Sequence, residues 1–449
     1  MIERKEGPLE HAIEGAWSGH VDVSGSRVAL VLHVDAAEDG GWSVHADFPQ
    51  LHRSGMPFTE VSLVGGELRF RSRSLGVFAG RLSDGGGQLA GVLVDGNAVR
   101  PVTFHRGVAA PVAPERPQLP VAPFPYEVED VFIEGVGGRL AGTLTKPRAT
   151  PRALALLVPG SGAMDRDETV FGHKPFLVLA DHLARHGYAS LRLDDRGVGA
   201  STGDRSAITV RDEADDTRAA FDWLSTRANL AGVPIGLLGH SMGCTVASIV
   251  AGERPRVAFL VTMAAAGAPL ADVLAEREGD SLRRLGFGDA AIERHRAFAL
   301  AVFAMLRDDA TLIDGAALDA CAVRFDAVAS MRALGTQTWI ARYNEAWFRS
   351  ALQLEPARLF ASLRMPVLAI NGSLDRQVPC GNLEAIARAF AATGHRDVET
   401  IELAGLNHLL QTCTTGEAYE YPIIEETFAP RALGAIRHWL DARFPPATA

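Results

Sequence analysis

Apolar and polar positions alternate with period two through the first part of the chain. Leu68 and Phe70, for example, alternate with Arg69 and Arg71, and glycine-rich turns separate stretches of this kind. Such alternation between glycine-rich turns is typical of antiparallel hairpins. Residues 1–107 are therefore predicted to form a separate all-β N-terminal domain, either a small barrel or a sandwich.

A proline-rich segment follows this domain. Six prolines occur between Pro111 and Pro125. Proline lacks a backbone donor and favours the extended polyproline II conformation. Residues 108–125 are therefore interpreted as a semi-rigid linker between two domains.

From residue 126 onwards, short apolar segments alternate with segments of helical pattern. Residues 153–158, 234–238 and 257–263 are mostly apolar, as expected of strands buried on both faces. Helices are expected between them, because Phe176, Leu179 and similar residues recur at helical spacing. This βαβ alternation predicts a mostly parallel sheet with helices on both faces, within a catalytic domain at residues 126–449.

The alternation stops between about residues 268 and 360. Ala, Leu, Arg and Glu dominate this stretch, which shows no strand pattern, and strands resume at residues 366–370. It is therefore predicted to be a helical insertion that forms a cap over the site. Trp339, Trp347 and Phe348 are its candidate pocket walls, although core packing is the more common role of any one of them.

The strongest chemical signal is the segment Gly239-His240-Ser241-Met242-Gly243. It directly follows the apolar strand and precedes a helix-forming stretch. A tight strand-to-helix turn leaves no room for side chains at the flanking positions, which explains the glycines two residues on either side of the serine. Such a turn presents the Ser241 hydroxyl above the strand ends, so Ser241 is the predicted nucleophile.

A serine nucleophile needs a base, and the base needs an acid that orients it. Asp375 follows the strand expected at residues 366–370, and His408 follows the one expected at 398–403. The loops at the carboxyl ends of the strands form the site in an open α/β sheet, and the chain order here is serine, acid, histidine. Asp375 and His408 are therefore the predicted acid and base.

Acyl transfer also needs two backbone donors for the oxyanion. Met242, directly after the nucleophile, is expected to supply one of them. The second is expected from the segment Pro159-Gly160-Ser161-Gly162, where glycines let the backbone approach a substrate. Ser161 is the preferred donor, with Gly160 and Gly162 as alternatives.

In these motifs the chain resembles the α/β-hydrolase superfamily, within its serine-esterase and serine-aminopeptidase-like branch. The matching segments are residues 159–162, 195–201, 239–243, 375–379 and 405–408. Bacterial esterases of the EstD type, which also carry a small β domain before the hydrolase domain, are particularly similar. The resemblance implies the α/β-hydrolase fold and acyl transfer on serine, and it implies a structural role for Arg196, which would brace the loop after its strand.

Composition limits the classes of partner. The 54 acidic residues outnumber the 44 basic ones, and the formal net charge of −10 gives no reason to expect nucleic acid or an anionic membrane surface as a partner. The N-terminus has no apolar region typical of a signal peptide, and no segment is apolar enough for a membrane span. A cytoplasmic location is therefore expected.

The four cysteines are scattered and indicate reduced thiols rather than a disulfide framework. A bond between Cys380 and Cys413 is left open, and Cys244, close to the nucleophile, is interpreted as a packing residue. No metal site and no cofactor are indicated by the sequence.

Together these features predict hydrolysis of a carboxylic ester, a small molecule, through a covalent acyl-enzyme on Ser241. The same triad serves peptidases, lactonases, thioesterases and acyltransferases, so these activities are alternatives. A non-catalytic ligand-binding protein on a hydrolase scaffold is an alternative of another class. Three candidate roles are left for the β domain, which are covering the site, forming a homodimer and binding a ligand.

Overall fold

The computed structural model describes residues 13–23, 26–37, 41–48, 53–72, 76–95, 98–107, 115–308 and 312–446. These residues form two compact units. The first, here called the β unit, runs to Glu115 and includes Glu417–Glu425, and the second, here called the α/β unit, contains the remainder. The N-terminal segment on which the signal-peptide prediction rests lies outside the described residues, as does the first part of the predicted linker, residues 108–114.

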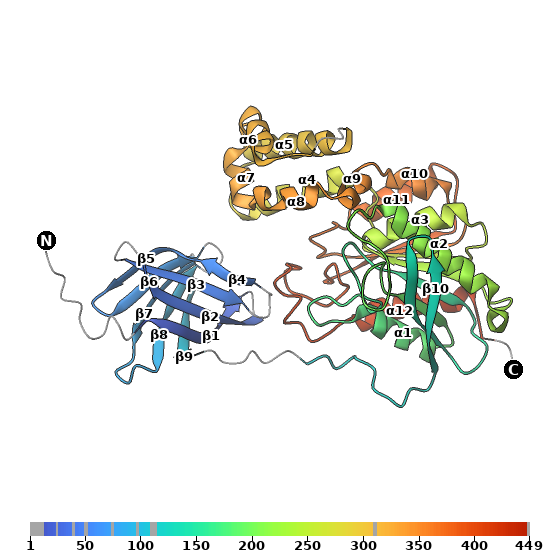
Figure 1. Cartoon of the computed structure of the whole chain (residues 1–449), viewed down its shortest axis with the longest axis horizontal. Helices are drawn as coiled ribbons and strands as arrows, with labels where there is room; N and C mark the ends of the chain where they lie inside the picture. The colour runs from blue at the N-terminus through green and yellow to red at the C-terminus, as the bar shows by residue number, and fades with distance from the viewer. Residues whose placement is uncertain are drawn as a thin grey trace. The chain divides into compact units, whose positions relative to one another are not determined.

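The β unit contains one antiparallel sheet, whose described strands follow the order β4-β3-β2-β1-β9-β8-β7-β6-β5 (Figure 1). The edge strands β4 (Arg53–Pro57) and β5 (Thr59–Val64) are consecutive in the chain, and β3 (Trp42–Phe48) lies against β5. The sheet is therefore nearly closed, which confirms the predicted β domain. The other strands are β1 (Gly15–Val23), β2 (Ser26–Ala36), β6 (Glu67–Ser72), β7 (Gly76–Leu82), β8 (Gln88–Asp95) and β9 (Ala98–Arg106).

The interior of the β unit is filled by alternate side chains of its strands. On β6, Leu68 and Phe70 are buried while Arg69 and Arg71 are exposed, as their alternation predicted. Large side chains from other strands, such as Trp17, complete this core. Period-two patterning therefore places one face of each strand inside the unit.

The α/β unit is built on a mixed sheet with the strand order β10-β11-β13-β12-β14-β15-β16-β17. β10 and β11 form an antiparallel hairpin, β11 pairs with β13 in antiparallel fashion, and the remaining pairs are parallel. This arrangement confirms the predicted mostly parallel sheet. Its strands are β10 (Glu127–Gly135), β11 (Gly138–Lys146), β12 (Leu154–Val158), β13 (Ala189–Leu193), β14 (Ile235–His240), β15 (Leu260–Met263), β16 (Val367–Gly372) and β17 (Val398–Leu403).

Helices cover both faces of this sheet (Figure 1). α1 (Pro175–Arg185) and α12 (Pro430–Arg443) pack on one face through a shared apolar cluster. α2 (Val210–Thr226), α3 (Met242–Glu253) and α11 (Asn382–Ala391) contribute to the larger cluster on the other face. The apolar strands between the two clusters are buried on both sides, as a parallel sheet requires.

A helical insertion separates β15 from β16, as predicted. Its helices are α4 (Leu270–Arg284), α5 (Asp289–Asp308), α6 (Gly315–Arg324), α7 (Val328–Leu334), α8 (Ile340–Tyr343), α9 (Ala346–Leu352) and α10 (Pro356–Ser362). α4 and α5 pack along each other, and α9 contacts α2 as well as α5. The insertion therefore shares the core on the face of the sheet that carries α2.

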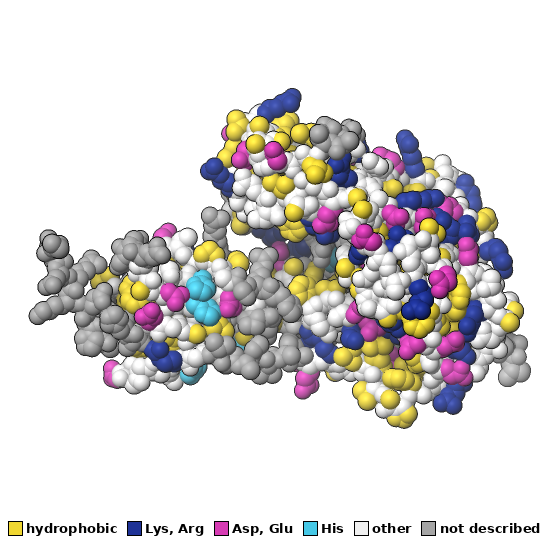
Figure 2. All heavy atoms as spheres, viewed as in Figure 1, with side chains coloured by type: hydrophobic (Ala, Val, Ile, Leu, Met, Phe, Trp, Pro, Cys, Tyr) yellow, Lys and Arg dark blue, Asp and Glu magenta, His cyan; other side chains and the backbone are white. Residues whose placement is uncertain are grey.

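Charged side chains are spread over the α/β unit. Figure 2 shows Lys and Arg interspersed with Asp and Glu over the visible face of this unit, so the negative net charge does not form a single patch there. In the described ranges, no helix has both the length and the apolar character needed to cross a bilayer.

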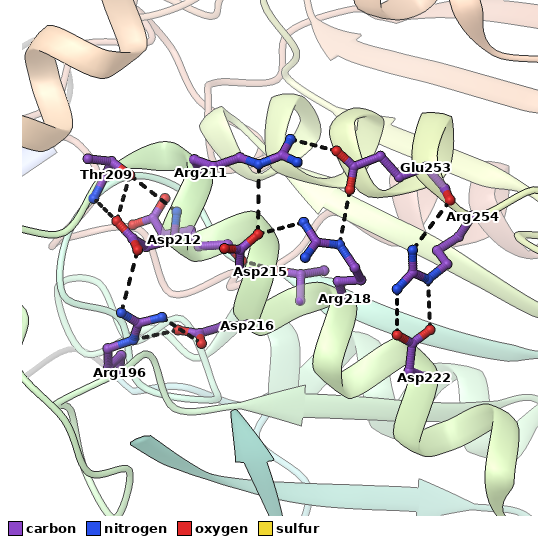
Figure 3. A network of polar contacts seen from close by, with 12 residues as sticks. Arg196, Thr209, Arg211, Asp212, Asp215, Asp216, Arg218, Asp222, Glu253 and Arg254 are labelled. Atoms are coloured by element: carbon purple, nitrogen blue, oxygen red, sulfur yellow. Dashed lines mark hydrogen bonds and ion pairs between the residues drawn. The ribbon is translucent and has the colours of Figure 1, made fainter. Parts of the chain in front are cut away.

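A network of charged side chains runs along α2 and reaches the end of α3 (Figure 3). Thr209 and Asp212 begin the helix with a capping box, in which each side chain accepts a hydrogen bond from the other residue's backbone N–H. One turn later, Asp216 accepts two hydrogen bonds of 2.8 and 3.0 Å from the buried guanidinium of Arg196. Arg196 belongs to the loop after β13, so this pair fixes that loop to α2, in agreement with the bracing role that the resemblance implied.

We expect Asp216→Asn to lower the free energy of unfolding of the α/β unit by about 3 kcal/mol, because it leaves the buried Arg196 guanidinium with only a longer ion pair, of 3.7 Å, to Asp212. The matched control is Asp222→Asn, which breaks the ion pair with Arg254 in the same network, where Asp222 is 50% exposed. An exposed pair contributes less than about 1 kcal/mol. Urea unfolding of both variants, followed by circular dichroism, measures the difference, and equal losses would contradict this role of Arg196.

Candidate active site

Ser241 occupies a strained turn between β14 and α3. Its backbone has a φ of 52° and a ψ of −123°, a region that residues with a side chain rarely adopt. A Cβ atom on Gly239 would lie 2.6 Å from the backbone of Cys244, and one on Gly243 would lie 2.2 Å from the Val158 carbonyl oxygen. Both glycines are therefore required for the chain to turn at Ser241, as their spacing around the serine predicted.

Asp375 and His408 lie in the loops that follow β16 and β17, and they form a buried hydrogen bond. His408 Nδ1 lies 2.8 Å from Asp375 Oδ2, and both side chains are at most 5% exposed. The other oxygen, Oδ1, accepts hydrogen bonds from the backbone N–H groups of Gln377 and Val378 at 2.8 and 2.9 Å. Two backbone donors thus orient the carboxylate so that its second oxygen faces the imidazole.

His240, the residue before Ser241, links the turn at Ser241 to His408. His240 Nε2 donates a hydrogen bond of 2.9 Å to the carbonyl oxygen of His408, and the two imidazole centroids are 5.0 Å apart. Among the described residues, no hydrogen bond joins Ser241 Oγ to His408. In enzymes without bound substrate such a bond is often long and shortens only in the substrate complex. The structure therefore brings the three predicted residues to one edge of the sheet with the serine–histidine contact open.

The loop after β12 lies directly against Ser241, the predicted nucleophile. A Cβ atom on Gly160 would be 3.3 Å from the Cβ of Ser241. The backbone N–H of Gly160 donates to Glu168 Oε1 at 2.7 Å, so it is not free to bind an oxyanion. No described residue accepts a hydrogen bond from the backbone N–H of Ser161 or Met242, and both residues line one cavity with Ser241. As an alternative to Ser161 for the second oxyanion donor, Gly160 is thus weaker than Gly162.

A buried pair of Glu168 and His240 connects these segments. His240 Nδ1 lies 2.8 Å from Glu168 Oε1, and their side chains are 9% and 2% exposed. Burial alone lowers the pKa of His240, but the Glu168 carboxylate and the carbonyl of His408 outweigh it and raise this pKa to about 9. Since both acceptors need a proton from the ring, His240 is an imidazolium at neutral pH. It joins the loop of Gly160, the turn at Ser241 and the loop of His408.

Arg205 also contacts the loop after β12. Its guanidinium contacts the Gly162 carbonyl oxygen and forms ion pairs with Asp195 at 3.3 Å and Glu213 at 3.2 Å. Burial, the largest effect, raises the pKa of Asp195 to about 7, although Arg205 opposes it. Glu213 also accepts a hydrogen bond of 2.9 Å from Trp347 Nε1. This chain of contacts fixes the helical insertion to the loop after β12.

Sequence reasoning missed the roles of Glu168, His240 and Arg205. The only local feature was the run Asp165-Arg166-Asp167-Glu168 between a buried strand and α1. Such a run normally lies in solvent, whereas here Glu168 is buried and Arg166 binds Asp194. The partners come from other strands and helices, so spacing along the chain does not identify them.

The cavity beside Ser241 has a volume of about 510 Å³ and lies between the sheet edge and the helical insertion. Trp339, Trp347 and Phe348, the predicted pocket walls, all line it. A volume of this size is within the usual range for a small-molecule site. The insertion therefore supplies much of the surface that a bound molecule would contact.

All four cysteines are free, so Cys380 and Cys413 are not bonded to each other. Cys244 is buried beside the turn, where its Sγ donates to the Gly239 carbonyl oxygen at 3.1 Å, and burial raises the pKa of its thiol. This thiol fills space and is not reactive. The described residues contain no cluster of three or more histidine, cysteine, aspartate or glutamate side chains suited to a metal ion.

Comparison with known proteins gives a family match over the same region. A model of the family described as serine aminopeptidase, S33, matches residues 174–412, just over half of the chain. Esterase EstD of Thermotoga maritima is 27% identical over 305 residues, which make up 68% of this chain. The aligned region spans 64% of that relative, less than two thirds of its length.

Three solved structures illustrate the similarity in three dimensions. An esterase from Pyrococcus furiosus is 16% identical, with a TM-score of 0.44, and the match covers 76% of this chain and 99% of that one. A thermophilic esterase from Thermogutta terrifontis is 21% identical, with a TM-score of 0.42 and coverage of 70% and 99%. Proline iminopeptidase from Mycobacterium smegmatis is 16% identical, with a TM-score of 0.44 and coverage of 71% and 100%.

The buried pair of His240 and Glu168 predicts a pH-dependent contribution to stability. The pKa of His240 is raised to about 9 in the folded chain from an ordinary value of 6.5. The folded state therefore binds more protons between these values, so the stabilisation is complete below pH 6.5 and is lost as pH rises through 9. We expect Glu168→Gln to lower the free energy of unfolding by about 3 kcal/mol at pH 6.5 and by clearly less at pH 10.

Thermal unfolding of wild type and variant across this pH range measures the effect. The matched control is Glu384→Gln, because Glu384 is 81% exposed and, among the residues that the structure describes, pairs only with Arg388 on the same helix. This control should leave the transition almost unchanged at every pH. A difference between wild type and Glu168→Gln that does not vary with pH would contradict the charged state of His240.

Proposed function

The chain belongs to the serine aminopeptidase S33 family of α/β-hydrolases, and from this premise we propose that it is a serine hydrolase that cleaves carboxylic esters. The observation that carries the proposal is the buried hydrogen bond of 2.8 Å between His408 and Asp375, next to the strained turn that exposes Ser241 to a cavity. The 27% identity to Esterase EstD supports an ester as the substrate.

In the proposed reaction, Ser241 Oγ attacks the ester carbonyl carbon while His408 Nε2 takes the hydroxyl proton. The negative charge that develops on the carbonyl oxygen accepts hydrogen bonds from the backbone N–H groups of Ser161 and Met242. Collapse of this intermediate releases the alcohol, which receives its proton from His408, and leaves the acyl group on Ser241. Water then attacks the acyl-enzyme by the same steps, which releases the carboxylic acid and returns the proton to Ser241 Oγ.

Asp375 keeps His408 in the tautomer that this reaction needs. Its carboxylate accepts from Nδ1–H, which leaves Nε2 unprotonated and able to accept the proton of Ser241. The same carboxylate stabilises the imidazolium that forms during the attack. The helical insertion acts as a cap, because it closes much of the cavity over Ser241 and excludes water from the reacting groups.

The aminopeptidase activity named in the family's description has less structural support in this chain than ester hydrolysis. An enzyme that removes N-terminal residues must bind a free ammonium group, which calls for an unpaired carboxylate. Glu278 is the one acidic side chain among the described residues that line the cavity, and it is hydrogen-bonded to His295 at 3.0 Å. The cavity therefore offers an amine no free counter-ion.

We expect Ser241→Ala to lower the turnover of 4-nitrophenyl butyrate by more than about 10³-fold, because no other group can form the acyl-enzyme. A fluorophosphonate probe should label Ser241 in the wild type, as peptide mass spectrometry would show. The matched control is Ser161→Ala, which removes a hydroxyl from the same cavity but keeps the backbone donor, so its turnover should fall less than about threefold. Full activity of Ser241→Ala would refute the proposal, and an unlabelled Ser241 would favour a non-catalytic binding protein.

A second variant tests the tautomer of His408. In Asp375→Asn, the backbone donors of Gln377 and Val378 would hold the amide oxygen and turn the NH₂ group towards His408. Nδ1 must then accept a hydrogen bond, which moves the ring proton to Nε2 and blocks proton transfer from Ser241. We expect kcat to fall by about 10³- to 10⁴-fold with an unchanged melting temperature. A loss below tenfold would show that Asp375 is not the orienting acid.

A further inference from the structure

Two arginines of the helical insertion line the cavity next to Ser241 and lack strong acidic partners. Arg277 lies on α4 and Arg342 on α8. Among the described residues, Arg277 bonds only through its backbone, whose carbonyl oxygen accepts from the Ser281 hydroxyl. Arg342 has a long ion pair of 3.8 Å with Glu345, whose side chain is 49% exposed. Both guanidinium groups can therefore bind another anion.

The acidic residue of the cavity is bonded to another side chain. Glu278 Oε2 lies 3.0 Å from Nε2 of the fully buried His295, and His295 Nδ1 lies 2.9 Å from the Ser330 hydroxyl. Among the described residues, Glu278 forms no ion pair with Arg277 or Arg342, so both guanidinium groups are available to another anion.

Tyr343 adds a neutral hydrogen-bond donor to the cavity that Arg277 and Arg342 line. Tyr343 lies on α8, is 94% buried and lines the cavity, and its hydroxyl has no hydrogen-bond partner among the described residues. Burial raises the pKa of this hydroxyl, so it keeps its proton. The walls nearby are apolar, since Trp347 and Phe348 face the same space. A hydrocarbon chain would contact these aromatic rings, while an anion at its end would meet the three donors.

We propose that the substrate is an ester that carries a carboxylate, and that Arg277 and Arg342 bind this carboxylate in the cavity beside Ser241. The inference rests on the proposed ester hydrolysis and names its substrate class. A guanidinium donates two parallel hydrogen bonds to a carboxylate, and such a charged pair is far stronger in a partly closed cavity than at a free surface. The arginines act in binding and not in bond cleavage, so their removal should raise KM and leave kcat nearly unchanged.

Matched substrate pairs test the proposal. Monomethyl adipate and methyl hexanoate have the same acyl chain and differ by a terminal carboxylate, and 4-acetoxybutanoate and butyl acetate differ in the same way on the alcohol side. We expect the wild type to prefer one of the carboxylate-bearing esters over its neutral partner by about 10- to 100-fold in kcat/KM. Which pair shows the preference tells on which side of the ester bond the arginines lie.

The variants Arg277→Gln and Arg342→Gln should remove most of this preference and leave the neutral esters within about threefold of wild type. The matched control is Arg283→Gln, because Arg283 lies on the same helix as Arg277, is 60% exposed and pairs with Asp280. It should keep the full preference. Equal kcat/KM values for the charged and neutral esters in the wild type would overturn the proposal.

A binding measurement separates this proposal from the proposed ester hydrolysis. Adipate should bind to the Ser241→Ala variant in isothermal titration calorimetry, and adding Arg277→Gln should weaken this binding at least tenfold. Adipate binding without turnover of any ester would support the anion site and refute the proposed activity. Turnover of neutral esters without adipate binding would refute the anion site and leave the activity standing.

Discussion

The candidate site depends on the turn at Ser241, where a residue with a side chain has a positive φ. Such a turn is costly by about 1–3 kcal/mol and persists only where its surroundings hold it. Gly239 and Gly243 let the chain approach neighbouring backbone, and the Ser241 N–H donates to the Met263 carbonyl oxygen at 2.8 Å. The strain is therefore balanced by contacts of β14 and α3 with the rest of the sheet, and Ser241 lines the cavity beside them.

A buried ion pair fixes the position of this turn relative to the two loops beside it. The imidazolium of His240 is satisfied on both nitrogens, by Glu168 on one side and by the carbonyl oxygen of His408 on the other. Glu168 in turn occupies the Gly160 N–H. One ion pair thus joins the turn at Ser241 to the loops of Gly160 and His408, and in the proposed reaction the N–H groups of Ser161 and Met242 are left for a substrate. Neither member of the pair takes part in the proposed reaction.

The helical insertion supplies most of the cavity surface that faces the site residues at the strand ends. Its contribution to the cavity is partly aromatic and partly cationic, and a contact from Trp347 to Glu213 fixes it to α2. The proposed chemistry comes from the sheet, whereas the charge and shape that would select a substrate come from the insertion. This division explains how one catalytic arrangement can serve many substrates across a family.

Periodicity and local motifs in the sequence were enough to predict the β unit, the mixed sheet, the insertion and the turn at Ser241. Each of these depends on interactions between residues close in the chain, such as alternation in a strand or glycines around a tight turn. Only the tertiary structure determined which residues pair with Glu168, Arg196 and Arg205. The same holds for the hydrogen bond that occupies the Gly160 N–H, and for the lack of an acidic partner for Arg277 among the described residues. A buried charge is stable only beside a partner, and here each partner comes from a different strand or helix, so its identity depends on how the chain folds in space.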